Sequence, residues 1–127
     1  VASGSVVLAR RTGGKKETLP LDGIAARLAT AMDKMQADLL AAALARREAA
    51  SLRGATKQQF IARMENEGGL VYGGFCGRSD CEAEIKDQTK ATIRVLPDEA
   101  FRSRDAPAKC MWCGRPSGAE AVWAKAY

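Results

Sequence analysis

The sequence predicts an α+β fold, in which a two-layer module of order β-α-β-α-β-β follows a β-hairpin and a long helix. Two observations lead to this prediction. An alanine-rich stretch with helical periodicity runs over about residues 22–52, and after it short runs of β-forming residues alternate with two helical patterns. A third observation, four cysteines in two close pairs, indicates how the module is held together. We therefore expect one segment at 1–52 and a second at 53–127.

The hairpin is predicted for the first twenty residues. Val6, Val7 and Leu8 favour a strand, residues 12–14 have the composition of a turn, and the chain returns at residues 18–20. A lone hairpin is marginal in water and needs a larger sheet to join. Because the chain also begins without methionine, we expect that an upstream sheet precedes this hairpin in the natural protein.

The long helix should carry one apolar face. Steps of four and three residues place a set of side chains on that face, namely Leu28, Met32, Met35, Leu39 and Ala42. A helix of this length would span roughly 45 Å, which is more than a 75-residue partner covers. We expect its methionines to pack in a core or between domains.

Four strands and two helices are expected in residues 53–127. An extended piece at 53–55 precedes a capping-box pattern, Thr56 to Gln59, which opens the first helix. That helix should stop at the glycine pair 68–69. The remaining elements are a strand at 70–75, a helix capped by Asp80, and strands at 91–96 and 119–127, with a charged loop at 98–109.

The four cysteines form a C-x4-C pair and a C-x2-C pair, with 28 residues between the pairs. Zn²⁺ takes four ligands tetrahedrally and favours thiolate sulfur. The chain has no histidine, so the predicted ligands are Cys76, Cys81, Cys110 and Cys113. Gly77 and Gly114 follow two of them and can take the positive φ that turns backbone N–H groups toward sulfur. Because four thiolates close the shell, we expect one structural zinc ion per chain and no catalytic one.

Three alternatives exist for the cysteines. Two disulfides would need an oxidising compartment, and the sequence shows no signal peptide. A redox C-x2-C would open a helix, whereas Pro116 and Ser117 follow this pair. Four free buried thiols would leave the paired spacing without a reason.

Composition excludes several classes of function. Without histidine, Ser-His-Asp and Cys-His catalysis are impossible, and the common glycine-rich nucleotide loops are absent. No apolar run approaches the ~20 residues that span a bilayer. The formal charge is +5, but residues 53–127 hold twelve Lys/Arg and ten Asp/Glu, and a zinc tetrathiolate would add −2. This near-neutral balance disfavours a zinc-ribbon nucleic-acid binder.

Several motifs resemble those of one protein family, and they occur in the same order along the chain. They are GGFCGRSDCE, the strand KATIR at 90–94, the knuckle CMWCGRP and the chain end AKAY. Together they resemble the C-terminal domain of archaeal/eukaryotic-type prolyl-tRNA synthetase. Residues 6–21 and the long helix are similar to the last hairpin and closing helix of that family's anticodon-binding domain.

The resemblance implies a module like the C-terminal domain of translation initiation factor three, with a structural zinc on the four cysteines. It implies that the parent is a cytoplasmic, homodimeric class II ligase that joins proline to tRNA(Pro) with ATP. The catalytic domain and most of the anticodon-binding domain would precede residue 1, and this segment would not bind ATP or catalyse the reaction. The carboxylate of Tyr127 would reach toward the parent's active site. The alternative is a free-standing zinc-binding interaction module derived from the synthetase.

Overall fold

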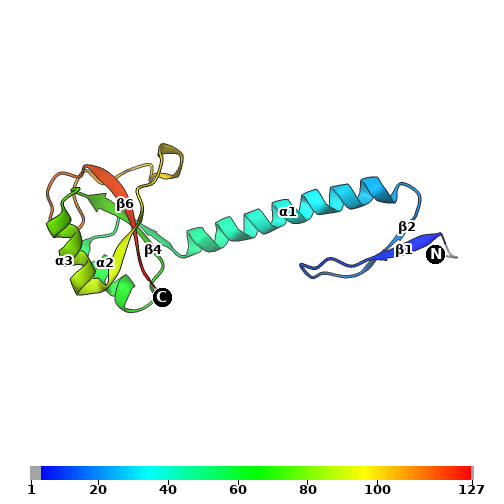
Figure 1. The fold of residues 1–127 in the computed structure, drawn as a ribbon, viewed down its shortest axis with the longest axis horizontal. Coiled ribbons are helices and arrows are strands. Elements are labelled where there is room, and N and C mark those ends of the chain that lie inside the picture. Colours follow the sequence, from blue (N-terminus) through cyan, green and yellow to red (C-terminus); the bar gives the residue numbers. More distant parts are fainter. Residues whose placement is uncertain (1–3, 127) are drawn as a thin grey trace. The chain divides into compact units, whose positions relative to one another are not determined.

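The computed structural model describes residues 4–126, which divide between Arg46 and Arg47 into two compact units. The first unit contains the predicted hairpin. Strand β1 (Ser5–Leu8) pairs antiparallel with β2 (Glu17–Pro20), with Val6 opposite Leu19 (Figure 1). An ion pair of 2.6 Å between Arg10 and Glu17 lies beside the turn.

Helix α1 (Ile24–Ala49) begins in the first unit and ends in the second. It has no buried residue, and much of the predicted apolar face is exposed: Met32 is 65 % exposed and Leu39 is 48 % exposed, whereas Met35 is half-buried. The predicted end at residue 52 is wrong. The Ser51 hydroxyl donates to the Arg47 carbonyl at 2.7 Å, and the chain then becomes extended.

The extended segment after α1 is strand β3 (Ser51–Arg53), two residues earlier than predicted. It pairs in parallel with the start of β4 (Leu70–Phe75), and the side chain of Leu52 packs against the core of the second unit. This packing explains the shift, because burial of Leu52 against the sheet outweighs continuation of the helix. The second unit therefore takes in β3 and the last residues of α1.

The second unit has the predicted order β-α-β-α-β-β. Its four-stranded sheet has the order β3-β4-β6-β5, with β6 (Ala119–Lys125) antiparallel to both β4 and β5 (Ala91–Val95). Helices α2 (Lys57–Glu65) and α3 (Ser79–Thr89) cover one face of this sheet (Figure 1). A short 3₁₀ turn, Glu99–Phe101, lies in the loop between β5 and β6.

The two helices begin differently. At α2 the predicted capping box is present: the Thr56 hydroxyl accepts from the N–H of Gln59, and the Gln59 side chain accepts from the N–H of Thr56. At α3 the predicted cap is wrong, because Arg78 holds the cap position and Asp80 lies in the first turn. The carboxylate of Asp80 instead accepts from the N–H of Cys81 at 2.8 Å.

An aromatic cluster forms the centre of the core between the helices and the sheet. Phe60 of α2 makes edge contacts with both Trp112 and Trp123, and in each contact the ring centroids are 6.2 Å apart. Phe75 also makes an edge contact with Trp123, with ring centroids 5.4 Å apart. Phe60 and Trp123 are fully buried. Trp112 lies between the two cysteines of the C-x2-C pair, so this core anchors the loop that carries them.

The opposite face of the sheet is covered by the loop that follows β5. The N–H of Ser103 donates to the buried carboxylate of Glu120 at 2.8 Å, and the Arg53 guanidinium lies over the ring of Tyr72 and donates to the Ser103 hydroxyl. The residues predicted as a charged loop thus cover the face of the sheet opposite to α2 and α3. Within residues 4–126, no helix has both the length and the apolar character that a bilayer span requires.

Candidate metal centre

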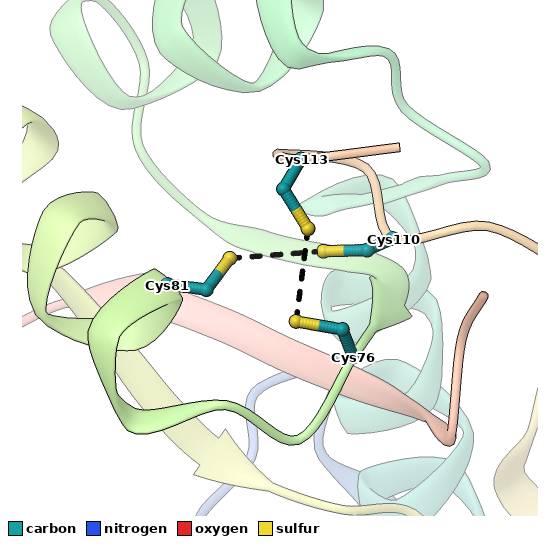
Figure 2. A group of neighbouring side chains, drawn as sticks. All are labelled: Cys76, Cys81, Cys110 and Cys113. Carbon is teal, nitrogen blue, oxygen red and sulfur yellow. Dashed lines mark hydrogen bonds between the residues drawn. The ribbon is translucent and has the colours of Figure 1, made fainter. Parts of the chain in front are cut away.

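Four cysteine side chains meet beside the end of β4. Cys76 follows that strand directly, and Cys81 lies in the first turn of α3. Cys110 and Cys113 come from the loop between β5 and β6. Figure 2 shows all four sulfur atoms pointing toward one another, and every pair of Sγ atoms is within 4.8 Å. The sequence prediction that these four residues come together is confirmed.

Two of the distances between sulfur atoms match those of a zinc tetrathiolate. With Zn–S bonds of roughly 2.3 Å, a tetrahedral site has sulfur atoms about 3.8 Å apart. The distance between Cys81 and Cys110 Sγ is 3.8 Å, and that between Cys76 and Cys113 Sγ is 3.7 Å. Four soft, negatively charged ligands at this spacing suit Zn²⁺, and no protein ligand is missing from a tetrahedral shell.

A pair of glycines in β4 lets the C-x2-C loop approach the strand. A Cβ atom on Gly74 would lie 2.2 Å from the carbonyl oxygen of Lys109, and one on Gly73 would lie 2.3 Å from the Met111 sulfur. Strand β3 ends opposite Tyr72, and beyond it the N–H of Met111 donates to the Gly74 carbonyl at 2.9 Å. The loop thus occupies the edge of β4 that β3 leaves free.

The loop itself closes on its own backbone. The N–H of Gly114 donates to the Cys110 carbonyl at 3.0 Å, and the N–H of Cys110 donates to the Arg115 carbonyl at 2.7 Å. Gly114 has φ +72° and Gly77 has φ +78°, as predicted for the residues that follow two of the cysteines. These conformations suit glycine because other residues would be strained there.

The environment acts differently on the two buried thiols. Burial raises the pKa of Cys110, but hydrogen bonds from the N–H groups of Cys113 and Trp112 lower it by more, and the result is a pKa of about 7. At Cys81, burial and the neighbouring sulfurs raise the pKa of the thiol above its usual range. Of these two thiols, Cys110 is therefore the one that ionises more readily, while the thiolate of Cys81 would need a nearby cation to stabilise it.

A charged pair lies next to the cysteines. The Arg78 guanidinium donates to both carboxylate oxygens of Asp80, with distances of 2.6 to 3.3 Å. The hydrogen bond from Arg78, followed by the backbone N–H of Cys81, lowers the pKa of Asp80 to about 2. This pair holds the first turn of α3, which carries Cys81.

Sequence reasoning missed the close approach of the C-x2-C loop to Gly73 and Gly74, and it missed the Arg78–Asp80 pair. The GG dipeptide inside a predicted strand was the available signal, since glycine within a strand often marks a close approach of backbone. Tyr127, the other predicted functional residue, lies outside the described residues.

The structure bears on the alternative interpretations of the cysteines. All four are free, and their closest sulfur atoms are 3.7 Å apart, whereas a disulfide bond measures about 2.05 Å. No helix starts after Cys113 in the described chain, because residues 114–118 lead into β6. A redox motif at a helix N-terminus is therefore not what this pair forms.

Comparison with known proteins places this chain in a family. The family model described as prolyl-tRNA synthetase, C-terminal, matches residues 57–127. Proline–tRNA ligase of Prosthecochloris aestuarii is 33 % identical over 132 residues, and that of Rubrobacter xylanophilus is 37 % identical over 127. The alignments cover all of this chain but only 27 % and 25 % of those relatives.

A solved structure agrees with this result at the level of the fold. Prolyl-tRNA synthetase from Cryptosporidium parvum, in complex with L-proline and AMP, matches with a TM-score of 0.84 and 21 % identity. The match covers 99 % of this chain and 26 % of that one. The chain spans about a quarter of the length of its relatives and belongs to the prolyl-tRNA synthetase family, in which it corresponds to the C-terminal part.

Proposed function

We propose that residues 53–127 are a structural zinc module, in which Cys76, Cys81, Cys110 and Cys113 bind one Zn²⁺ ion as thiolates. The convergence of four sulfurs within 4.8 Å of one another carries this proposal. The bound ion would supply folding free energy and no reactive position, since four thiolates leave no place for water or substrate. It would tie the end of β4 and the start of α3 to the loop before β6.

The protein that contains this module is proposed to be a proline–tRNA ligase. Its activity would be to join proline to tRNA(Pro) with ATP, as a cytoplasmic class II synthetase that forms a homodimer. The names of the relatives support this assignment, and the quarter-length match supports a segment that works beside other domains of the same enzyme. Residues 1–52 would belong to the anticodon-binding domain, and residues 53–127 would form the C-terminal domain.

The segment is proposed to support the synthetase and not to catalyse. The sequence contains no histidine and no phosphate-binding glycine loop. ATP would therefore be bound elsewhere in the parent enzyme. The carboxylate of Tyr127 is proposed, from the family resemblance alone, to reach toward the parent's active site. A fixed anion there could orient a cationic group by charge-assisted hydrogen bonds.

The test compares two proteins from the same gene. The chain alone should bind one zinc ion and show no proline-dependent exchange between ATP and pyrophosphate, whereas the complete open reading frame should show this exchange. A reading frame that holds only this chain, expressed as a folded zinc protein, would contradict the synthetase assignment and favour a free-standing module. Exchange by the chain alone would contradict the supporting role.

A further inference from the structure

The four sulfur atoms of the metal centre differ in their access to solvent. Cys81 and Cys110 are 5 % and 3 % exposed, whereas Cys113 is exposed and Cys76 is half-buried. The two accessible residues are also a close pair, since their Sγ atoms lie 3.7 Å apart (Figure 2). The centre therefore has one open edge, made of Cys76 and Cys113, and one closed edge, made of Cys81 and Cys110.

We propose that the Cys76–Cys113 edge is a site of oxidative modification, at which a hydroperoxide converts the two zinc-bound thiolates into a disulfide and zinc leaves. The proposal rests on the zinc site proposed above. Thiolate character and exposure decide which cysteine is oxidised, and this edge has both once zinc is bound. The geometry points to Cys113 as the sulfur that the peroxide reaches first.

The chemistry balances with hydrogen peroxide as the oxidant. The Cys113 thiolate attacks the peroxide and takes one oxygen to form a sulfenic acid, and the O–O bond breaks to release water after protonation. The Cys76 thiolate then attacks that sulfur, a disulfide forms, and the hydroxyl group leaves as a second water. Two thiolates have lost two electrons, and two protons from solvent complete the two waters. With two ligands left, zinc is held weakly and is released.

The remaining pair can follow, with Cys110 as the thiolate that attacks the peroxide and with Cys81 releasing its thiol proton as it attacks the resulting sulfenic acid. After zinc leaves, Cys81 and Cys110 lie within reach of each other, with Sγ atoms 3.8 Å apart. A second peroxide would join them. Each disulfide then links one cysteine of the C-x4-C pair to one of the C-x2-C pair, so neither bond is local in sequence.

This pattern has a consequence for the fold. The cross-linked chain would still tie the end of β4 to the loop before β6, which is what the zinc ion is proposed to do. Reduction by a small thiol would return the four thiolates and allow zinc to bind again, because thiol–disulfide exchange reverses the bond formation. Local disulfides, between Cys76 and Cys81 or between Cys110 and Cys113, would not link the end of β4 to the loop before β6.

The test uses the zinc-loaded chain and hydrogen peroxide. One equivalent is added in the presence of a chromogenic zinc chelator, free thiols are alkylated under denaturing conditions, and tryptic peptides are mapped without reduction. Trypsin gives peptide 64–78 with Cys76, peptide 79–86 with Cys81, and peptide 110–125 with both remaining cysteines. We expect peptide 64–78 linked to 110–125, with Cys113 as the linked residue by fragmentation and Cys81 and Cys110 alkylated. A first bond that is local or that involves Cys81 would overturn the proposal, and so would retention of zinc.

Two matched variants sharpen the result, because each keeps three ligands. Cys81→Ser should still form the Cys76–Cys113 bond with the first equivalent of peroxide, and Cys113→Ser should lose it. Equal behaviour of the two variants would contradict the proposal, and if neither folds, the peptide map of the unmodified chain decides. The zinc content measured before oxidant separates the two hypotheses: a chain without zinc contradicts the proposed function, whereas a zinc-loaded chain with the wrong bond contradicts only this inference.

Discussion

Gly74 lies against the carbonyl oxygen of Lys109 so closely that a Cβ atom on Gly74 would be 2.2 Å from it. The neighbouring atom belongs to backbone and cannot turn aside, so Gly74→Ala must push the C-x2-C loop away from β4. We expect a loss of about 1–3 kcal/mol in the free energy of unfolding, together with weaker zinc binding. Denaturant unfolding and competition with a chelator measure the two effects.

The control for this substitution is Gly118→Ala. Its nearest neighbour would be the Phe75 carbonyl oxygen at 3.9 Å, an ordinary contact, so the change should stay within about 0.5 kcal/mol. Gly73→Ala should fall between the two, because its neighbour is the movable Met111 side chain. Equal effects at Gly74 and Gly118 would show that the loop is not seated on β4 as described.

The aromatic core predicts a second large effect. Phe60 is fully buried and contacts both tryptophans, so Phe60→Ala should lower the free energy of unfolding by about 3–5 kcal/mol. Tryptophan fluorescence should shift as Trp112 and Trp123 become more accessible. The matched control is Phe101→Ala, since that side chain is 56 % exposed. A similar loss at both positions would argue against a core centred on Phe60.

The pH dependence should separate the thiolates from the carboxylate beside them. Arg78 lowers the pKa of Asp80 to about 2, so the stability that Asp80 contributes is fully present above its unfolded pKa of about 3.9 and is lost only as pH falls through about 2. Zinc must instead leave when its thiolates are protonated. We expect the difference in stability between the wild type and Asp80→Asn to stay constant between about pH 5 and 7, while zinc loss weakens both. A difference that shrinks in that window would mean that Asp80 titrates there.

Deletion of Tyr127 tests the role proposed from the family resemblance. In the isolated chain, its loss should leave zinc content and thermal unfolding nearly unchanged, because chain termini usually tolerate change. In the complete enzyme the same deletion should reduce proline-dependent exchange between ATP and pyrophosphate. Normal exchange by the truncated enzyme would leave Tyr127 with no role in activity.

The convergence of the four cysteines and the order of elements could be predicted because they depend on local patterns. Cysteine spacing named all four side chains that come together, and the pattern of Thr56 and Gln59 identified the start of α2. The end of α1 could not be found in this way, since nothing local says that Leu52 packs against a sheet whose next strand begins at Leu70. The packing of the C-x2-C loop against Gly74 depends on a contact with Lys109, which is 35 positions away in sequence. Propensity and periodicity do not report such contacts.

The most direct test of the zinc proposal is the zinc content of the chain, measured by elemental analysis after purification under reducing conditions. Four converging thiolates that supply folding free energy should hold one zinc ion per chain, and removal of that ion by a chelator should unfold residues 53–127 while leaving α1 helical. A value near one zinc per chain is the predicted result. A chain without zinc whose second unit is nonetheless folded and unfolds cooperatively would contradict the account.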